Sequence, residues 1–180
     1  MKLTPTATNA AEARLKRLAA NIEALAQKDE LAAQHARQIG ATRNAAAAEL
    51  YAICAAFVDG LNRLLPRPEV MIDPADADAA ILHELPRCLI QINVRGRILQ
   101  IEYEATAELI STEEFRVPYI LAGSVRAFNQ ELLEKDLIEE QLVFFTLEKH
   151  RSMWRFFDPR TYRSGPLDRD YLVSLMEQLI

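Results

Sequence analysis

The densest group of side chains that could take part in chemistry lies between residues 149 and 163. The segment has several basic residues but only one acid, Asp158. Aromatic residues, including Trp154 and Phe156, lie between the basic ones. Arginine beside aromatic rings suits stacking on bases and contact with phosphates, so the segment is a candidate for binding nucleic acid or another anionic ligand. The candidate arginines are Arg151, Arg155, Arg160 and Arg163.

A strand also explains this segment without any ligand. Successive side chains of a strand point to opposite faces, which places Trp154 and Phe156 in a core and Arg155 on the other side. The arginines could then pair with the acidic segment 131–140, in the same chain or in another. We favour this structural role over an acidic partner, and an acidic partner over nucleic acid. The net charge of −5 also argues against nonspecific adhesion to nucleic acid.

The three histidines show no spacing typical of a metal or catalytic site. His35, His83 and His150 are far apart in the sequence, whereas such sites need several convergent groups. The five glycines are isolated from each other, which excludes a glycine-rich phosphate loop. A small-molecule or enzyme function would need a pocket with perturbed acids such as Glu102 or Glu104. We therefore predict a noncatalytic protein with no metal and no cofactor.

Three acidic residues, Asp73, Asp76 and Asp78, are spaced like the start of a calcium-binding loop. Such a loop also needs a central glycine and a final bidentate glutamate, and neither follows here. A helix that begins after Pro74 is the better interpretation, because acids near a helix N-terminus are stabilised by its dipole.

Residues 1–65 have the heptad pattern of a long helix or a helix pair. The spacing from Asn9 to Glu12 is that of a capping box and predicts a helix start. In a coiled coil, the first and fourth positions of each heptad form the seam, the helix face that packs against the partner helix. Counting in sevens from Leu15 to Leu64 gives fifteen seam positions, of which twelve are apolar. The frame continues across Gly40, where the helix could also stop and restart.

The apolar stripe of this arm changes in width. It is broad from Leu50 to Leu65, which is typical of a helix packed on a domain, and Pro66 then ends the helix. Before Gly40 it is a narrow seam, which we expect to pair with another helix of the same chain or of a partner subunit. A homodimer is the favoured form. The candidate interaction residues on the narrow seam are Leu15, Leu18, Ile22 and Leu25.

Two hairpins are predicted in residues 66–180. The first joins strands 87–94 and 97–104 through the turn Arg95-Gly96, and its register places the cross-strand partners named below on the apolar face. The second joins 141–148 and 153–158. The expected cross-strand pairs are Ile92 with Leu99, Ile90 with Ile101 and Cys88 with Tyr103 in the first hairpin, and Leu147 with Trp154 and Phe145 with Phe156 in the second.

The remaining segments complete an α+β fold. Residues 115–121 are predicted as an edge strand because of Pro118, residues 130–140 as a short helix or turn, and a C-terminal helix is expected to open at 164–166. The prediction is thus a long N-terminal helix or helix pair in residues 1–65. In residues 66–180 a four- to five-stranded antiparallel sheet follows, covered by helices that include a C-terminal one.

The compartment and the function class follow from simpler features. Cys54 and Cys88 lie in apolar runs and are expected to be buried thiols, so nothing requires an oxidising environment. We expect no signal peptide and no membrane-spanning helix, hence a cytoplasmic protein. The favoured function is protein–protein interaction or assembly, with self-association through the helical arm.

Overall fold

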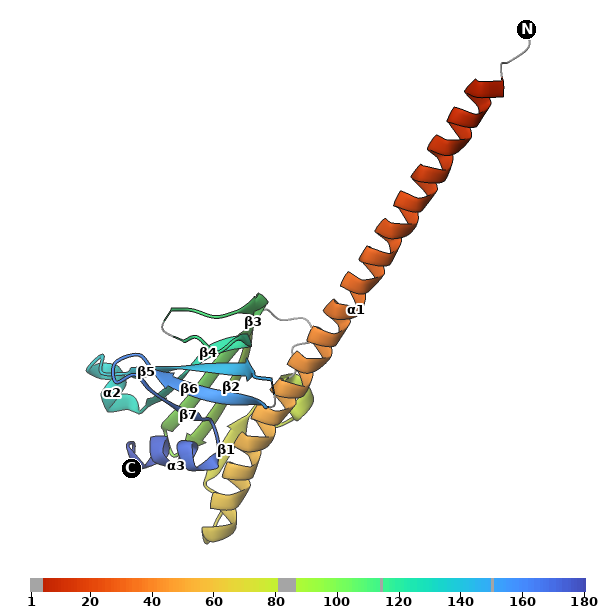
Figure 1. The fold of residues 1–180 in the computed structure, drawn as a ribbon. Coiled ribbons are helices and arrows are strands. Elements are labelled where there is room, and N and C mark those ends of the chain that lie inside the picture. The colour runs from red at the N-terminus through yellow and green to blue at the C-terminus, as the bar shows by residue number, and fades with distance from the viewer. Residues whose placement is uncertain (1–4, 81–86, 114, 150) are drawn as a thin grey trace. The chain divides into compact units, whose positions relative to one another are not determined.

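The structure is a computed structural model that describes residues 5–80, 87–113, 115–149 and 151–180. The architecture is α+β, with one long N-terminal helix, a seven-stranded antiparallel sheet and a C-terminal helix (Figure 1). The chain forms two compact units, Met1–Ala41 and Thr42–Ile180. The α+β class is therefore confirmed, but the expected count of four to five strands is wrong.

Helix α1 runs from Pro5 to Leu64 without a break. Gly40 stays helical, so the chain has one long helix rather than a helix pair. The capping box at Asn9 is also wrong, because that residue lies inside the helix. Proline is well tolerated in the first turn of a helix, where its missing N–H would have no partner, and this permits the earlier start at Pro5.

One stretch of α1 between Asn9 and Leu64 is long and apolar enough to cross a bilayer, judged by length and composition alone. Within the protein, 39% of that stretch is buried. A helix that packs on a protein core passes the same test, so this property does not by itself indicate a membrane.

The sheet is a simple meander in which each strand pairs antiparallel with the next, from β1 to β7. A 3-10 helix, η1 (Ala77–Ala80), follows β1, and α2 (Gln130–Glu134) and α3 (Arg169–Glu177) follow β4 and β7. The strands are β1 (Val70–Asp73), β2 (Arg87–Val94), β3 (Arg97–Ile110), β4 (Tyr119–Phe128), β5 (Glu139–Leu147), β6 (Ser152–Asp158) and β7 (Arg163–Pro166).

The two additional strands are β1 and β7, the short outer strands of the sheet. The sequence Ser164-Gly165-Pro166 was expected to open the last helix, but it belongs to β7. An outer strand tolerates proline because one side of it needs no ladder hydrogen bond. Helix α3 starts later, after Asp168, whose Oδ1 accepts a hydrogen bond of 3.0 Å from the backbone N–H of Tyr171. The helix expected after Pro74 is the short η1, which starts at Ala77.

The first predicted hairpin is confirmed in strands and register. The pairs Ile92 with Leu99, Ile90 with Ile101 and Cys88 with Tyr103 are all present between β2 and β3. In the second hairpin the register is wrong by two residues. Phe145 pairs with Trp154, and Leu147 pairs with Ser152 instead of Trp154. The backbone N–H of Glu148 donates to Arg151 O, in agreement with this register.

Strand β4 differs from the predicted strand 115–121 in both its residue range and its place in the sheet. It begins at Tyr119, just after Pro118, and lies between β3 and β5 rather than at an edge. Gly123 faces Tyr103 on β3, and a Cβ built at Gly123 would lie 1.9 Å from Glu102 O. Only glycine permits this close approach of the two backbones.

Two apolar clusters lie on opposite faces of the sheet. Adjacent residues of a strand point to opposite sides, so Phe145 joins the main core and Phe144 joins a smaller cluster. The smaller cluster also holds Phe115, Tyr119 and Phe157. Phe115 stacks on Phe144 with a ring-centroid distance of 4.4 Å. The segment before β4 thus covers part of the second face.

The main core joins the sheet to the second half of α1 and to α3. Its α1 residues include Ala46, Leu50, Cys54 and Phe57. Within the same unit, Trp154 is 1% exposed, and its ring lies edge-on to Tyr103 at 5.3 Å between centroids. The broad apolar stripe of α1 therefore packs on the sheet.

Asn62, near the end of α1, holds the outer strand β1. Its Oδ1 accepts hydrogen bonds of 3.0 Å from the backbone N–H groups of Glu69 and Val70. Its Nδ2 donates to Val70 O at 2.8 Å. One amide side chain thus satisfies three backbone groups where the chain turns from the helix into the sheet.

Candidate functional site

The narrow seam of α1 is exposed from Leu15 to Leu25. All residues from 9 to 32 are exposed, and Leu15, Leu18, Ile22 and Leu25 have exposed fractions between 56% and 66%. These four lie on one helix face because their spacing alternates between three and four residues. A row of large apolar side chains at this spacing is the surface that coiled-coil helices bury against each other.

Apart from the seam, the arm carries mostly charged, polar and alanine side chains. The charged residues form local pairs along the helix, such as Lys16 with Glu12 at 3.3 Å and Arg37 with Glu30 at 3.0 Å. His35 is exposed on the same helix. The seam is thus the apolar feature of a helix that is otherwise well solvated.

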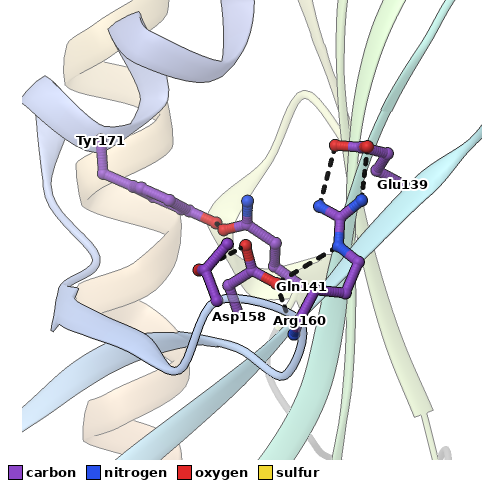
Figure 2. A network of polar contacts seen from close by, with 6 residues as sticks. Glu139, Gln141, Asp158, Arg160 and Tyr171 are labelled. Carbon is purple, nitrogen blue, oxygen red and sulfur yellow. Dashed lines mark hydrogen bonds and ion pairs between the residues drawn. The ribbon is translucent and has the colours of Figure 1, made fainter.

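The arginines of the basic segment 149–163 are distributed over β6, β7 and the turns that flank β6. Arg160 lies in the turn between β6 and β7 and is held by two acids (Figure 2). Its Nη2 donates to Glu139 Oε2 at 2.8 Å, and its Nε donates to Asp158 Oδ1 at 3.3 Å. The partner Glu139 belongs to the acidic segment 131–140, so this arginine pairs with that segment within one chain.

Electrostatics follow from this geometry. The hydrogen bond from Arg160 lowers the pKa of Glu139. Asp158 also has a lowered pKa, chiefly because its carboxylate accepts a hydrogen bond from the backbone N–H of Arg160, with Thr161 Oγ1 donating a second at 2.9 Å. Beside this network Tyr171 donates to Gln141 Oε1 at 2.8 Å. Arg160 therefore ties the turn to β5, and Tyr171 ties α3 to the same strand.

The other three candidate arginines come from other positions in the fold. Arg155 is half-buried on β6 and pairs with Glu148 at 3.4 Å. Arg151 is exposed before β6, and Arg163 is exposed at the start of β7. Since Arg155 and Arg160 already contact carboxylates, a phosphate bound by either of these two would have to displace an acid.

The acids Glu102 and Glu104 line an open depression of about 380 Å³ on the sheet face that carries the smaller cluster. Arg87 bridges them, with 3.1 Å to each carboxylate, and Arg126 lies 3.6 Å from Glu102. The arginines at this site were not among the candidates. The predicted register of β2 and β3 already placed Arg87 opposite Glu104, so this cluster could have been found from the sequence.

No metal site emerges among the residues that the structure describes, where no group of three or more His, Cys, Asp and Glu side chains could hold an ion. His83 and His150 lie outside the described residues. Asp76 has a local structural role, since its Oδ1 accepts a hydrogen bond from the backbone N–H of Asp78 at 3.1 Å.

Comparison with known protein families, with curated proteins and with solved structures gives no match to this chain.

Proposed function

We propose that this chain is a noncatalytic interaction or assembly protein that self-associates through the arm of α1. The observation that carries the proposal is the exposed seam of Leu15, Leu18, Ile22 and Leu25. A helix gains most of its stability in a protein from packing one face. Residues 9–32 of α1 instead expose their apolar face to water.

Simple energetics support a dimer. Two copies of the seam contribute eight large side chains, and complete burial of each is worth about 1.5–3 kcal/mol. Association costs about 4–15 kcal/mol in lost translational and rotational freedom. The sheet domain, Thr42–Ile180, includes the part of α1 that packs on the sheet. In this proposal it is the part of the chain that binds other proteins.

Sedimentation equilibrium of the full chain tests self-association. We expect a concentration-dependent dimer that Leu15→Gln together with Ile22→Gln converts to monomer, because glutamine keeps helix propensity but removes the apolar contact. Leu31 offers a matched control. It is 66% exposed, as Leu15 is, but lies off the seam. Leu31→Gln should leave the dimer intact. A strict monomer of the unmodified chain at tens of micromolar would rule the proposal out.

A further inference from the structure

The four large seam residues are arranged symmetrically about residue 20. Leu18 and Ile22 lie two residues on either side of it, and Leu15 and Leu25 lie five residues on either side. A twofold axis perpendicular to a helix pairs residue i of one copy with residue 40 − i of the other. Each large apolar residue then faces another large apolar residue, as an isologous interface requires.

The ends of the helix allow this pairing. Helix α1 starts at Pro5, so an antiparallel overlap centred on residue 20 extends to residue 35 in each copy. Such an overlap is about 45 Å long at 1.5 Å per residue. Alanines flank the centre on the same face, at Ala19 and Ala26, and both are exposed. Their small side chains allow the two helices to approach closely.

Asp29 distinguishes this arrangement from a parallel one. It occupies the seam one heptad after Ile22 and is exposed. In a parallel pair in register, Asp29 would face its own copy inside the seam, and burying two like charges together is costly. In the antiparallel pair Asp29 faces Ala11 of the partner subunit, near the end of the apolar contact.

The antiparallel pairing has one unfavourable feature, which provides a test. It brings Arg14 beside Lys28 of the partner subunit, on the flank of the seam. Both side chains are exposed, so solvent and salt weaken their repulsion. A screened repulsion on the flank is smaller than the repulsion between two desolvated carboxylates in the seam, so the antiparallel pairing is favoured.

We infer that the partner of the arm is a second copy of this chain, bound antiparallel so that Leu15 faces Leu25 and Leu18 faces Ile22 across a twofold axis at residue 20. This inference rests on the proposed self-association. It adds orientation and register, and it places the two sheet domains at opposite ends of the shared helical contact.

Charge reversal tests the orientation without altering the seam. Lys28→Glu should tighten the dimer about three- to tenfold, because it turns two repulsive contacts with Arg14 into attractive ones. Arg14→Glu should have the same effect. The double variant Arg14→Glu, Lys28→Glu should return to the affinity of the unmodified chain, since two acids now face each other. A parallel dimer predicts no such coupling.

Disulfide trapping tests the register directly. A Leu15→Cys chain mixed with a Leu25→Cys chain should form a cross-linked pair, whereas neither variant alone should. In the antiparallel pair each introduced thiol is about 15 Å along the helix from its own copy, and a disulfide needs Cα atoms within about 7 Å. Cys54 and Cys88 are buried, and the unmodified chain is the control for them.

The possible results separate the two proposals. A monomer at all concentrations removes the proposed function and this inference together. A dimer in which Leu15→Cys cross-links to itself, or a larger oligomer, overturns the antiparallel register but leaves self-association standing. Cross-linking only in the mixture, together with the charge coupling, supports both.

Discussion

The indole Nε1 of Trp154 donates a hydrogen bond of 2.7 Å to the backbone carbonyl oxygen of Ala46, 108 positions earlier in the sequence. The bond is buried and joins β6 to the middle of α1. A buried tryptophan usually finds a partner for its N–H, and here the partner is a carbonyl group of the helix. This contact adds a directional bond to the apolar packing between the second half of α1 and the sheet.

Trp154→Phe should lower the free energy of unfolding by about 1–3 kcal/mol, because it removes this hydrogen bond and leaves a small void. Urea denaturation followed by circular dichroism measures the change. Tyr171→Phe is the matched control, since it removes only a half-buried hydroxyl bonded to Gln141 and should cost about 1 kcal/mol or less. A Trp154→Phe variant as stable as the unmodified chain would show that the contact does not hold the helix.

Gly123→Ala should destabilise the sheet by about 3 kcal/mol or more, since its Cβ would lie 1.9 Å from a backbone oxygen that cannot move independently. Gly60 provides the control, because a Cβ there meets nothing within 4 Å. Gly60→Ala lies inside α1 and should stabilise the protein by about 1 kcal/mol. Fluorescence of Trp154, the only tryptophan in the sequence, reports the unfolding of both variants. Equal effects of the two substitutions would contradict the steric argument.

The acids held by Arg160 make stability depend on pH in the acid range. In the folded state the pKa of Glu139 lies below its ordinary value of 4.5 and that of Asp158 below 3.8. Their stabilisation is therefore complete above those ordinary values and is lost as the pH falls through the lower folded values.

Arg160→Gln should consequently flatten the pH dependence of the urea midpoint below about pH 5, with the largest difference from the unmodified chain at neutral pH. Arg67→Gln removes the same charge from an exposed position and should keep the original pH profile. Parallel profiles for the unmodified chain and Arg160→Gln would mean that the network does not contribute to folding.

Both native thiols should be protected in the folded protein. Cys54 is 0% exposed, and burial raises its pKa to about 12. Burial also raises the pKa of Cys88. Since the thiolate is the reactive form, an aromatic disulfide reagent at pH 8 should react slowly with the native chain and rapidly with two thiols in denaturant. Leu31→Cys supplies an exposed thiol as the positive control. Fast reaction of the unmodified chain would be inconsistent with the core.

The parts of the fold that sequence could predict are those where periodicity and turn chemistry agree. The Arg95-Gly96 hairpin is an example, because Arg95 and Gly96 adopt positive φ values of 51° and 86° and the alternation on both sides fixes the register. The broad stripe of α1 around Leu50 similarly follows from helical spacing.

The errors arose where the local pattern was short or ambiguous. Strand β1 has four residues and alternates too briefly to be recognised, and Gly165-Pro166 in β7 resembles a helix start. The second hairpin lacks a strong turn signal, so its register slipped by two residues, which preserves the faces but not the partners.

For the candidate surfaces, the sequence identified the seam residues but not the contacts of the arginines. The position of Leu15, Leu18, Ile22 and Leu25 on one face is a property of any helix with this spacing. The pairing of Arg160 with Glu139 depends on the turn between β6 and β7, where Tyr162 has a positive φ of 57°. Local pattern alone does not specify such a turn.

The amide of Asn62 also bears on how copies of this protein can meet. An outer strand with free N–H and C=O groups is a template on which another strand can add, and repeated addition leads to aggregation. Because Asn62 occupies both the N–H and the C=O of Val70, β1 offers an incomplete template for such growth. One side chain at the end of the helix thus discourages open-ended stacking through β1.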